Sequence, residues 1–145
     1  MKVKDLLKIK GYTVTTIGPN ETTHAAIQKL VENNIGALPV CDTKGTMLGI
    51  VSERDLLRVC SQRSRAIDSI KVKDAMTKNI AIGIPEDDLD YVMHIMTQKG
   101  IRHLPIMDGP KLAGILSMRD IVEAQLEESK AQVRFLGDYI SGGYV

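Results

Sequence analysis

The chain is poor in aromatic residues and in cysteine: its 145 residues include no Trp, one Phe, four Tyr and two Cys. Surfaces that bind single-stranded nucleic acid stack bases on aromatic side chains, and so few aromatics argue against such a surface. The 19 Lys and Arg nearly balance the 18 Asp and Glu, giving a formal net charge of +1 without a long basic run. We therefore expect no nucleic-acid partner. The two cysteines, Cys41 and Cys60, favour free thiols over a disulfide framework.

Long apolar runs are also missing, because charged residues interrupt the aliphatic stretches throughout the chain. A membrane-spanning helix needs about 18 or more consecutive apolar residues, and no stretch of this sequence reaches that length. The first residues, MKVKDLLKIKG, lack the apolar centre and small-residue cleavage site of a secretory signal. The sequence therefore predicts a soluble, cytoplasmic protein without a membrane partner.

One sequence pattern occurs twice. GIVSERDLLR begins at Gly49 and GILSMRDIVE begins at Gly114, while IGALPVCD from Ile35 returns as IRHLPIMD from Ile101. VKDLL near the N-terminus likewise returns as VKDAM. Repetition over this length indicates two copies of one structural unit.

Each unit shows the same order of secondary-structure signals. A run rich in β-formers, over residues 12–17 or 80–84, ends at a proline, which favours an extended chain before it. Apolar residues at helical spacing then predict a helix. Two short apolar runs separated by a turn follow, and a second helix begins at Ser52 or Ser117. Each unit therefore reads β-α-β-β-α, which makes the fold class α+β.

A single unit has a sheet face that it cannot cover alone, so we expect the two sheets to pack together. We place the first unit at residues 1–61, a polar connector at residues 62–70 and the second unit at residues 71–145. The last helix extends past its first-unit counterpart and carries an apolar stripe: Val122, Leu126, Val133, Leu136 and Ile140. A neighbouring module is the expected cover for that stripe.

Each repeated turn contains Ser-x-x-Asp, as Ser52 with Asp55 and as Ser117 with Asp120. One interpretation is structural, because a serine and an acid at this spacing cap a helix and contribute about 1 kcal/mol. The other is a ligand site, because a helix N-terminus attracts anions and a carboxylate accepts hydrogen bonds from a sugar diol. The glycine three residues before each serine leaves room for a ligand or for backbone. These residues alone leave both interpretations open.

The turn Gly-hydrophobic-x-Ser-x-x-Asp, preceded by IGALPVCD or IRHLPIMD, resembles the cystathionine β-synthase (CBS) domain. The resemblance spans nearly the whole chain, and two such domains in tandem form a Bateman module. It implies two β-α-β-β-α repeats with pseudo-twofold symmetry, packed sheet to sheet, with two clefts between them. It also implies adenosine-containing ligands in those clefts, a regulatory role, and pairing of modules into a homodimer.

Carried over by position, the resemblance implies that Ser117 and Asp120 hold the ribose in one cleft, and Ser52 and Asp55 in the other. Basic residues near these turns are the implied phosphate contacts: Arg102, His103 and Arg119 in the first cleft, and Arg54 in the second. Residues of the opposite unit hold the base, mainly by backbone: Gly18, Ile35, Gly36 and Ala37 in the first cleft, and Ile84, Ile101 and Arg102 in the second.

The two clefts are not equivalent in sequence. Arg102 and His103 stand where the first unit has only Gly36 and Ala37. Together with Arg119 they can surround a phosphate, while the two small residues leave space for adenine. We therefore predict the tighter site in the Ser117/Asp120 cleft, and a weak or empty site in the other.

The sequence thus predicts a non-catalytic regulatory module that binds AMP, ADP, ATP or NAD, senses energy or redox state, and acts on an unidentified regulated protein. We expect no catalytic residue, catalytic cofactor or metal site, since phosphate-loop and Rossmann glycine motifs are missing and the histidines lack ligand spacing. The alternative is a structural dimerisation or interaction module without a ligand, in which the Ser-x-x-Asp turns are only helix caps.

Overall fold

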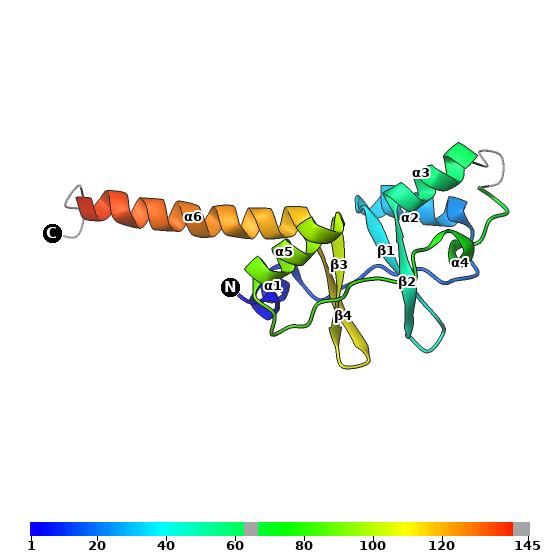
Figure 1. Ribbon diagram of the computed structural model, residues 1–145, viewed down its shortest axis with the longest axis horizontal. Coiled ribbons are helices and arrows are strands. Elements are labelled where there is room, and N and C mark those ends of the chain that lie inside the picture. Colours follow the sequence, from blue (N-terminus) through cyan, green and yellow to red (C-terminus); the bar gives the residue numbers. More distant parts are fainter. Residues whose placement is uncertain (63–66, 141–145) are drawn as a thin grey trace.

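A computed structural model describes residues 1–62 and 67–140 of the chain. Two antiparallel hairpins lie side by side at its centre (Figure 1). In the first, β1 (Ala37–Cys41) pairs with β2 (Met47–Ser52); in the second, β3 (His103–Asp108) pairs with β4 (Lys111–Ser117). The two hairpins belong to the two sequence repeats, and the fold is α+β as predicted.

Two helices accompany each hairpin: α2 (Thr23–Asn33) and α3 (Glu53–Gln62) in the first unit, and α5 (Leu89–Lys99) and α6 (Met118–Ile140) in the second. The first helix of each pair ends at a residue in the left-handed conformation, Asn34 at φ 52° and Gly100 at φ 63°. Asn and Gly tolerate this conformation better than other residues, so both helices end where the sequence permits a left-handed cap. The two units therefore have the same order of elements, and the first helix of each ends in the same left-handed cap.

The extended run before each proline forms less strand than the sequence predicts. Only Ile17 and Gly83 make bridges, each parallel, to Val40 and Ile106 respectively. The reason is the path of the chain, because the residues just before each bridge cross from one unit to the other. Only the last part of each run therefore reaches the edge of a hairpin.

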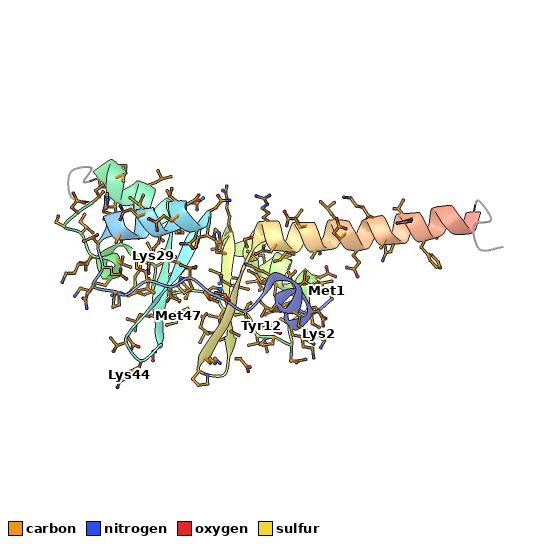
Figure 2. All side chains as sticks on the ribbon, turned by 180° about the vertical axis from the view of Figure 1, so that it is seen from behind. Met1, Lys2, Tyr12, Lys29, Lys44 and Met47 are labelled. Carbon is orange, nitrogen blue, oxygen red and sulfur yellow. The ribbon has the colours of Figure 1, made fainter. Side chains whose placement is uncertain are left out.

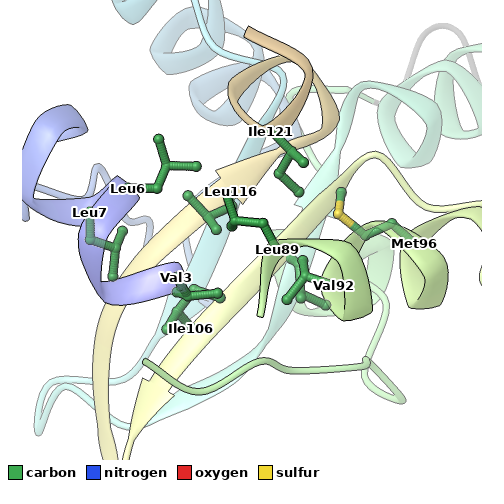
Figure 3. Packing of buried hydrophobic residues seen from close by; sticks show 10 residues of the cluster. Val3, Leu6, Leu7, Leu89, Val92, Met96, Ile106, Leu116 and Ile121 are labelled. Carbon is green, nitrogen blue, oxygen red and sulfur yellow. The ribbon is translucent and has the colours of Figure 1, made fainter. Parts of the chain in front are cut away.

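The short helix at the start of each repeat packs on the opposite unit. α1 (Val3–Lys10) buries Val3, Leu6 and Leu7 in the apolar core of the second unit, where Figure 3 shows them beside Leu116. α4 (Val72–Ala75) correspondingly buries Val72 in the core of the first unit. The core of the second unit therefore contains α1, which precedes the first hairpin in sequence. The core of the first unit contains α4, which precedes the second hairpin.

Helix α6 begins in the core of the second unit and then leaves it. Ile121 is fully buried, whereas Leu126, Val133 and Leu136 are 53%, 66% and 56% exposed. Figure 1 shows the helix projecting as a single rod away from both hairpins. None of the helices in the described ranges is both as long and as apolar as a membrane span has to be.

Candidate functional site

The two Ser-x-x-Asp turns lie at matching strand-to-helix corners. Ser52 ends β2 directly before α3, and Ser117 ends β4 directly before α6. The first helical N–H of each corner donates to the loop before the preceding hairpin: to the Gly36 carbonyl at 3.0 Å, and to the Arg102 carbonyl at 2.8 Å. These bonds place Gly36 and Arg102 beside their own corners.

The carboxylate of Asp55 is enclosed by protein donors, and the residue is only 4% exposed. Its Oδ2 accepts hydrogen bonds from the Ser52 amide at 2.8 Å and the Ser52 hydroxyl at 3.0 Å. Its Oδ1 accepts one from the Thr77 hydroxyl at 3.1 Å, and Arg58 Nη1 lies 3.5 Å away. Both oxygens therefore already accept hydrogen bonds. The contacts with Ser52 are those of a helix cap, and the contact with Thr77 ties the corner to the segment that follows α4.

The carboxylate of Asp120 is more open, with 23% of its side chain exposed. Its Oδ2 accepts hydrogen bonds from the Ser117 amide at 2.8 Å and from Lys10 Nζ at 2.6 Å. The Asp120 amide donates back to the Ser117 hydroxyl at 3.0 Å. The Ser117 amide and Lys10 both use Oδ2, and Oδ1 forms no hydrogen bond among the residues that the structure describes, so it can accept a further donor.

The charge of Asp120 is stabilised by its neighbours. Burial raises its pKa, but the hydrogen bond and charge of Lys10, with the hydrogen bonds of Ser117, lower the pKa more. The net pKa of Asp120 lies below the ordinary aspartate value, so the carboxylate is ionised at neutral pH. A negatively charged acceptor with an open oxygen is suited to a donor such as a sugar hydroxyl.

His103 lies where the two units meet. A Cβ added to Gly36 would be 2.9 Å from His103 Cε1 and 3.2 Å from Glu53 Oε1. Only a glycine therefore fits at residue 36 without moving the imidazole. Burial lowers the pKa of His103, and the charged groups around it act in both directions: Glu53 and Asp120 raise it, and Lys10 and Arg102 lower it. The net pKa is lowered, so the ring is neutral at pH 7.

The structure therefore brings together part of the predicted Ser117/Asp120 site. Gly36, His103 and Asp120 gather at one junction, with Arg102 near enough to act on the pKa of His103. Arg119 instead lies on the outer face of α6, where its side chain is 85% exposed and bonds Glu123 at 3.0 Å. Arg54 is also exposed.

Two of the remaining base-contact candidates, Gly18 and Ile84, lie in equivalent turns. The Gly18 amide donates to Glu21 Oε2 at 2.8 Å, and the Ile84 amide donates to Asp87 Oδ2 at 2.9 Å. Ile35 and Ile101 are half-buried, and each follows the first helix of its unit. Ala37 is buried at the start of β1. Gly18 and Ile84 thus each have an amide already held by an acidic side chain.

A cleft of about 930 Å³ lies between the crossing segment, residues 12–18, and the turns of the two hairpins. Its lining comes from residues 12–18, 41–46 and 110–112, together with Glu21 and Lys29. Figure 2 shows Tyr12 on the crossing segment and Lys44 at the tip of the first hairpin. Gly18, predicted as a base contact of the Ser117/Asp120 cleft, lies in this lining, whereas Ser117 and Asp120 do not. The cleft is therefore separate from the Ser117/Asp120 corner.

Sequence reasoning missed Lys10 at the end of α1, which bonds Asp120, and Thr77 just after α4, which bonds Asp55. Both follow the repeated VKD stretch, whose recurrence shows that these segments belong to the structural unit. The repeat alone does not show which unit each segment joins. That choice depends on tertiary packing, which places α1 on the second unit.

Two repeats with interleaved first helices and matching corners define a paired-repeat module. A family model described as "CBS domain" matches residues 3–62 and again residues 72–127. The chain therefore belongs to the CBS-domain family, as a tandem pair.

Known relatives agree over most of the chain. The mitochondrial CBS domain-containing protein CBSX3 of Arabidopsis thaliana is 33% identical, covering 98% of this chain and 73% of its own length. YhcV of Bacillus subtilis, also a CBS domain-containing protein, is 31% identical and covers 89% of each chain.

Solved structures give the same fold. The CBS-domain containing protein ATU1752 of Agrobacterium tumefaciens has a TM-score of 0.83 at 39% identity, covering 86% of this chain and 99% of its own. The CBS domain pair of protein MJ0100, crystallised with 5′-methylthioadenosine and S-adenosyl-L-methionine, has a TM-score of 0.76 at 25% identity. It covers 90% of this chain and 98% of its own.

Proposed function

We propose that this CBS pair is a non-catalytic sensor that binds an adenosine nucleotide, namely AMP, ADP, ATP or NAD, at the Ser117/Asp120 corner. The observation that carries the proposal is the difference between the two carboxylates. Asp55 has donors on both oxygens, whereas the Ser117 amide and Lys10 share one oxygen of Asp120. A ribose diol therefore finds an acceptor at Asp120 that it does not find at Asp55.

Basic groups beside Asp120 suit the phosphate of such a ligand. Arg102 and His103 come from the loop and strand next to the corner, and Lys10 comes from the end of α1. His103 now fills the space next to Gly36. Adenine can enter that space when the imidazole rotates out toward the phosphate, which exchanges one packing contact for a hydrogen bond. The complex of the MJ0100 pair with two adenosine compounds supports this ligand class.

The bound nucleotide touches both units, so it favours the arrangement of units in which it makes the most contacts. A second copy of the chain is the partner we propose for the exposed stripe of α6, because Leu126, Val133 and Leu136 leave a large apolar surface in water. A regulated protein would then respond to the geometry of the dimer. The transmitted free energy is limited to the difference in ligand affinity between the two states.

A thermal-shift screen tests the proposal against the ligand-free alternative. A ligand that binds only the folded chain raises the melting temperature, with about 2.7 kcal/mol of stabilisation at 100 times its dissociation constant. We expect a shift with at least one of AMP, ADP, ATP and NAD, and no shift with the same compound in Asp120→Ala. No shift with any of them at saturating concentration would support a structural interaction module instead.

A further inference from the structure

Lys10 occupies the carboxylate that the ribose is proposed to use. Its Nζ lies 2.6 Å from Asp120 Oδ2 and 2.6 Å from the Ile115 carbonyl oxygen. Lys10 is the last residue of α1, and that helix is fixed in the second unit by Val3, Leu6 and Leu7. The ammonium is thus held at the corner by two acceptors and by an anchored helix.

A sugar diol and Lys10 compete for Asp120. The Ser117 amide and Lys10 already donate to Oδ2, whose two lone pairs are then both used. A vicinal diol that bridges the two carboxylate oxygens therefore takes the position of the ammonium on Oδ2. The ligand must displace Lys10 before it binds in this way.

The displaced ammonium needs a new anionic partner. With 34% of its side chain exposed, Lys10 has a flexible stem that lets the ammonium swing toward solvent. A 5′-phosphate attached to the same ribose brings such a partner close to the corner, where Arg102 also lies. A neutral 5′ group offers no partner, so its ligand loses the Lys10–Asp120 ion pair without replacement.

We infer that Lys10 is a displaceable counterion of Asp120 that makes the site selective for adenosine ligands with a 5′-phosphate over neutral adenosine thioethers. The inference rests on the proposed function, since it concerns the same corner. It separates this chain from a site that takes the neutral thioether 5′-methylthioadenosine. Lys10 thereby determines specificity through charge exchange and does not take part in a reaction.

The test compares AMP with 5′-methylthioadenosine by calorimetry on the full chain. In Lys10→Met, the ratio of AMP affinity to 5′-methylthioadenosine affinity should fall about tenfold, the usual effect of losing one charge-assisted hydrogen bond to the phosphate. Affinity for 5′-methylthioadenosine should stay the same or rise, because no ion pair has to be broken. Lys10→Arg should retain the preference for AMP. Lys8→Met is the matched control, since it removes the same charge from an exposed position of the same helix.

The outcomes separate the two proposals. If the wild-type chain binds AMP but Lys10→Met and Lys10→Gln keep the wild-type ratio of the two affinities, the role of Lys10 is refuted and the sensor function stands. Equal loss in Lys8→Met would also refute it, because the effect would then be general electrostatic attraction. If the wild-type chain binds neither compound and also none of ADP, ATP and NAD, the proposed function fails and the inference fails with it.

Discussion

Thr77 donates a hydrogen bond to Asp55 at 3.1 Å, and Lys10 donates one to Asp120 at 2.6 Å. In each case the donor lies on the segment that precedes one repeat, and the carboxylate belongs to the other repeat. The contacts are equivalent in position but differ in chemistry, because a threonine hydroxyl is neutral and a lysine ammonium is charged. This difference leads to opposite expectations for the two carboxylates.

Asp55→Ala should weaken the fold more than it weakens ligand binding. The substitution leaves the Ser52 amide and the Thr77 hydroxyl without an acceptor in a buried corner, and such a loss costs about 1–3 kcal/mol. Urea denaturation should show this decrease in the free energy of unfolding. Calorimetry with AMP should give an affinity close to that of the wild type.

Asp120→Ala should abolish most AMP binding, because it removes the proposed ribose acceptor. Its effect on unfolding should be smaller than that of Asp55→Ala, since Asp120 is more exposed and its ion pair with Lys10 is partly screened. The same two measurements on both variants form a crossed comparison. Loss of AMP binding in Asp55→Ala with retention in Asp120→Ala would reverse the assignment of the two clefts.

His103 should make AMP affinity depend on pH. Its free-state pKa is lowered, mainly by burial, and the groups that face it are Glu53, Lys10, Asp120 and Arg102. A bound phosphate raises the pKa of the imidazole, so the complex binds more protons than the free protein does. Linkage then requires the affinity to increase as pH falls through the range in which the bound form is protonated and the free form is not.

Calorimetry between pH 8 and pH 5.5, about one unit below the ordinary histidine pKa, measures this dependence. His103→Gln is the control, because it keeps a hydrogen-bond donor but does not titrate, and it retains the contribution of the phosphate's own ionisation. The difference between the two pH profiles reports His103 alone. Identical profiles would show that His103 does not contact the phosphate.

The local parts of the fold were predictable because the sequence signals were local. The Ser-x-x-Asp spacing correctly indicated a helix start directly after Ser52 and Ser117, and the capping bonds form at both. The lengths of the first strands were overestimated, because β-propensity over residues 12–17 does not reveal that most of the run crosses between units. Only Ile17 in that run forms a bridge.

The site was predictable only in part, because its missing members come from far along the chain. Asp120 and His103 could be found from the repeat, but Lys10 reaches Asp120 across 110 residues. The repeated VKD stretch indicated a shared element without indicating its partner. The partner is decided by the burial of residues such as Leu7, which is 1% exposed in the core of the second unit.

Gly49→Ala should destabilise the chain more than Gly114→Ala. A Cβ at residue 49 would lie 2.6 Å from the Thr77 carbonyl oxygen, which is held by a backbone bridge to Ile50. A Cβ at residue 114 would lie 2.7 Å from Leu7 Cδ2, a methyl group at the end of a side chain. Side-chain ends move more easily than paired backbone, so the first clash is harder to relieve.

Overpacking of this kind typically costs about 1–3 kcal/mol, and we place Gly49→Ala at the upper end of that range. Chemical denaturation of both variants at the same pH measures the difference. Gly45→Ala is a useful third variant, because among the described residues no atom beyond its two chain neighbours lies within 4 Å of its added Cβ, and its cost would come from the positive φ of 83°. A larger loss in Gly114→Ala than in Gly49→Ala would contradict the comparison.

The apolar stripe of α6 should mediate self-association. Leu126, Val133 and Leu136 lie on one side of the helix by their spacing, and all are more than half exposed. Burying such side chains contributes about 1.5–3 kcal/mol each, so Leu126→Ser with Val133→Ser should raise the dimer dissociation constant at least about tenfold. Sedimentation velocity over a concentration series measures this constant.

Glu127→Ser with Arg134→Ser is the matched control, since each position lies one residue further along the helix and therefore on a different face. A wild-type chain that sediments as a monomer throughout, or a control pair that dissociates the dimer equally, would show that this stripe does not join two copies.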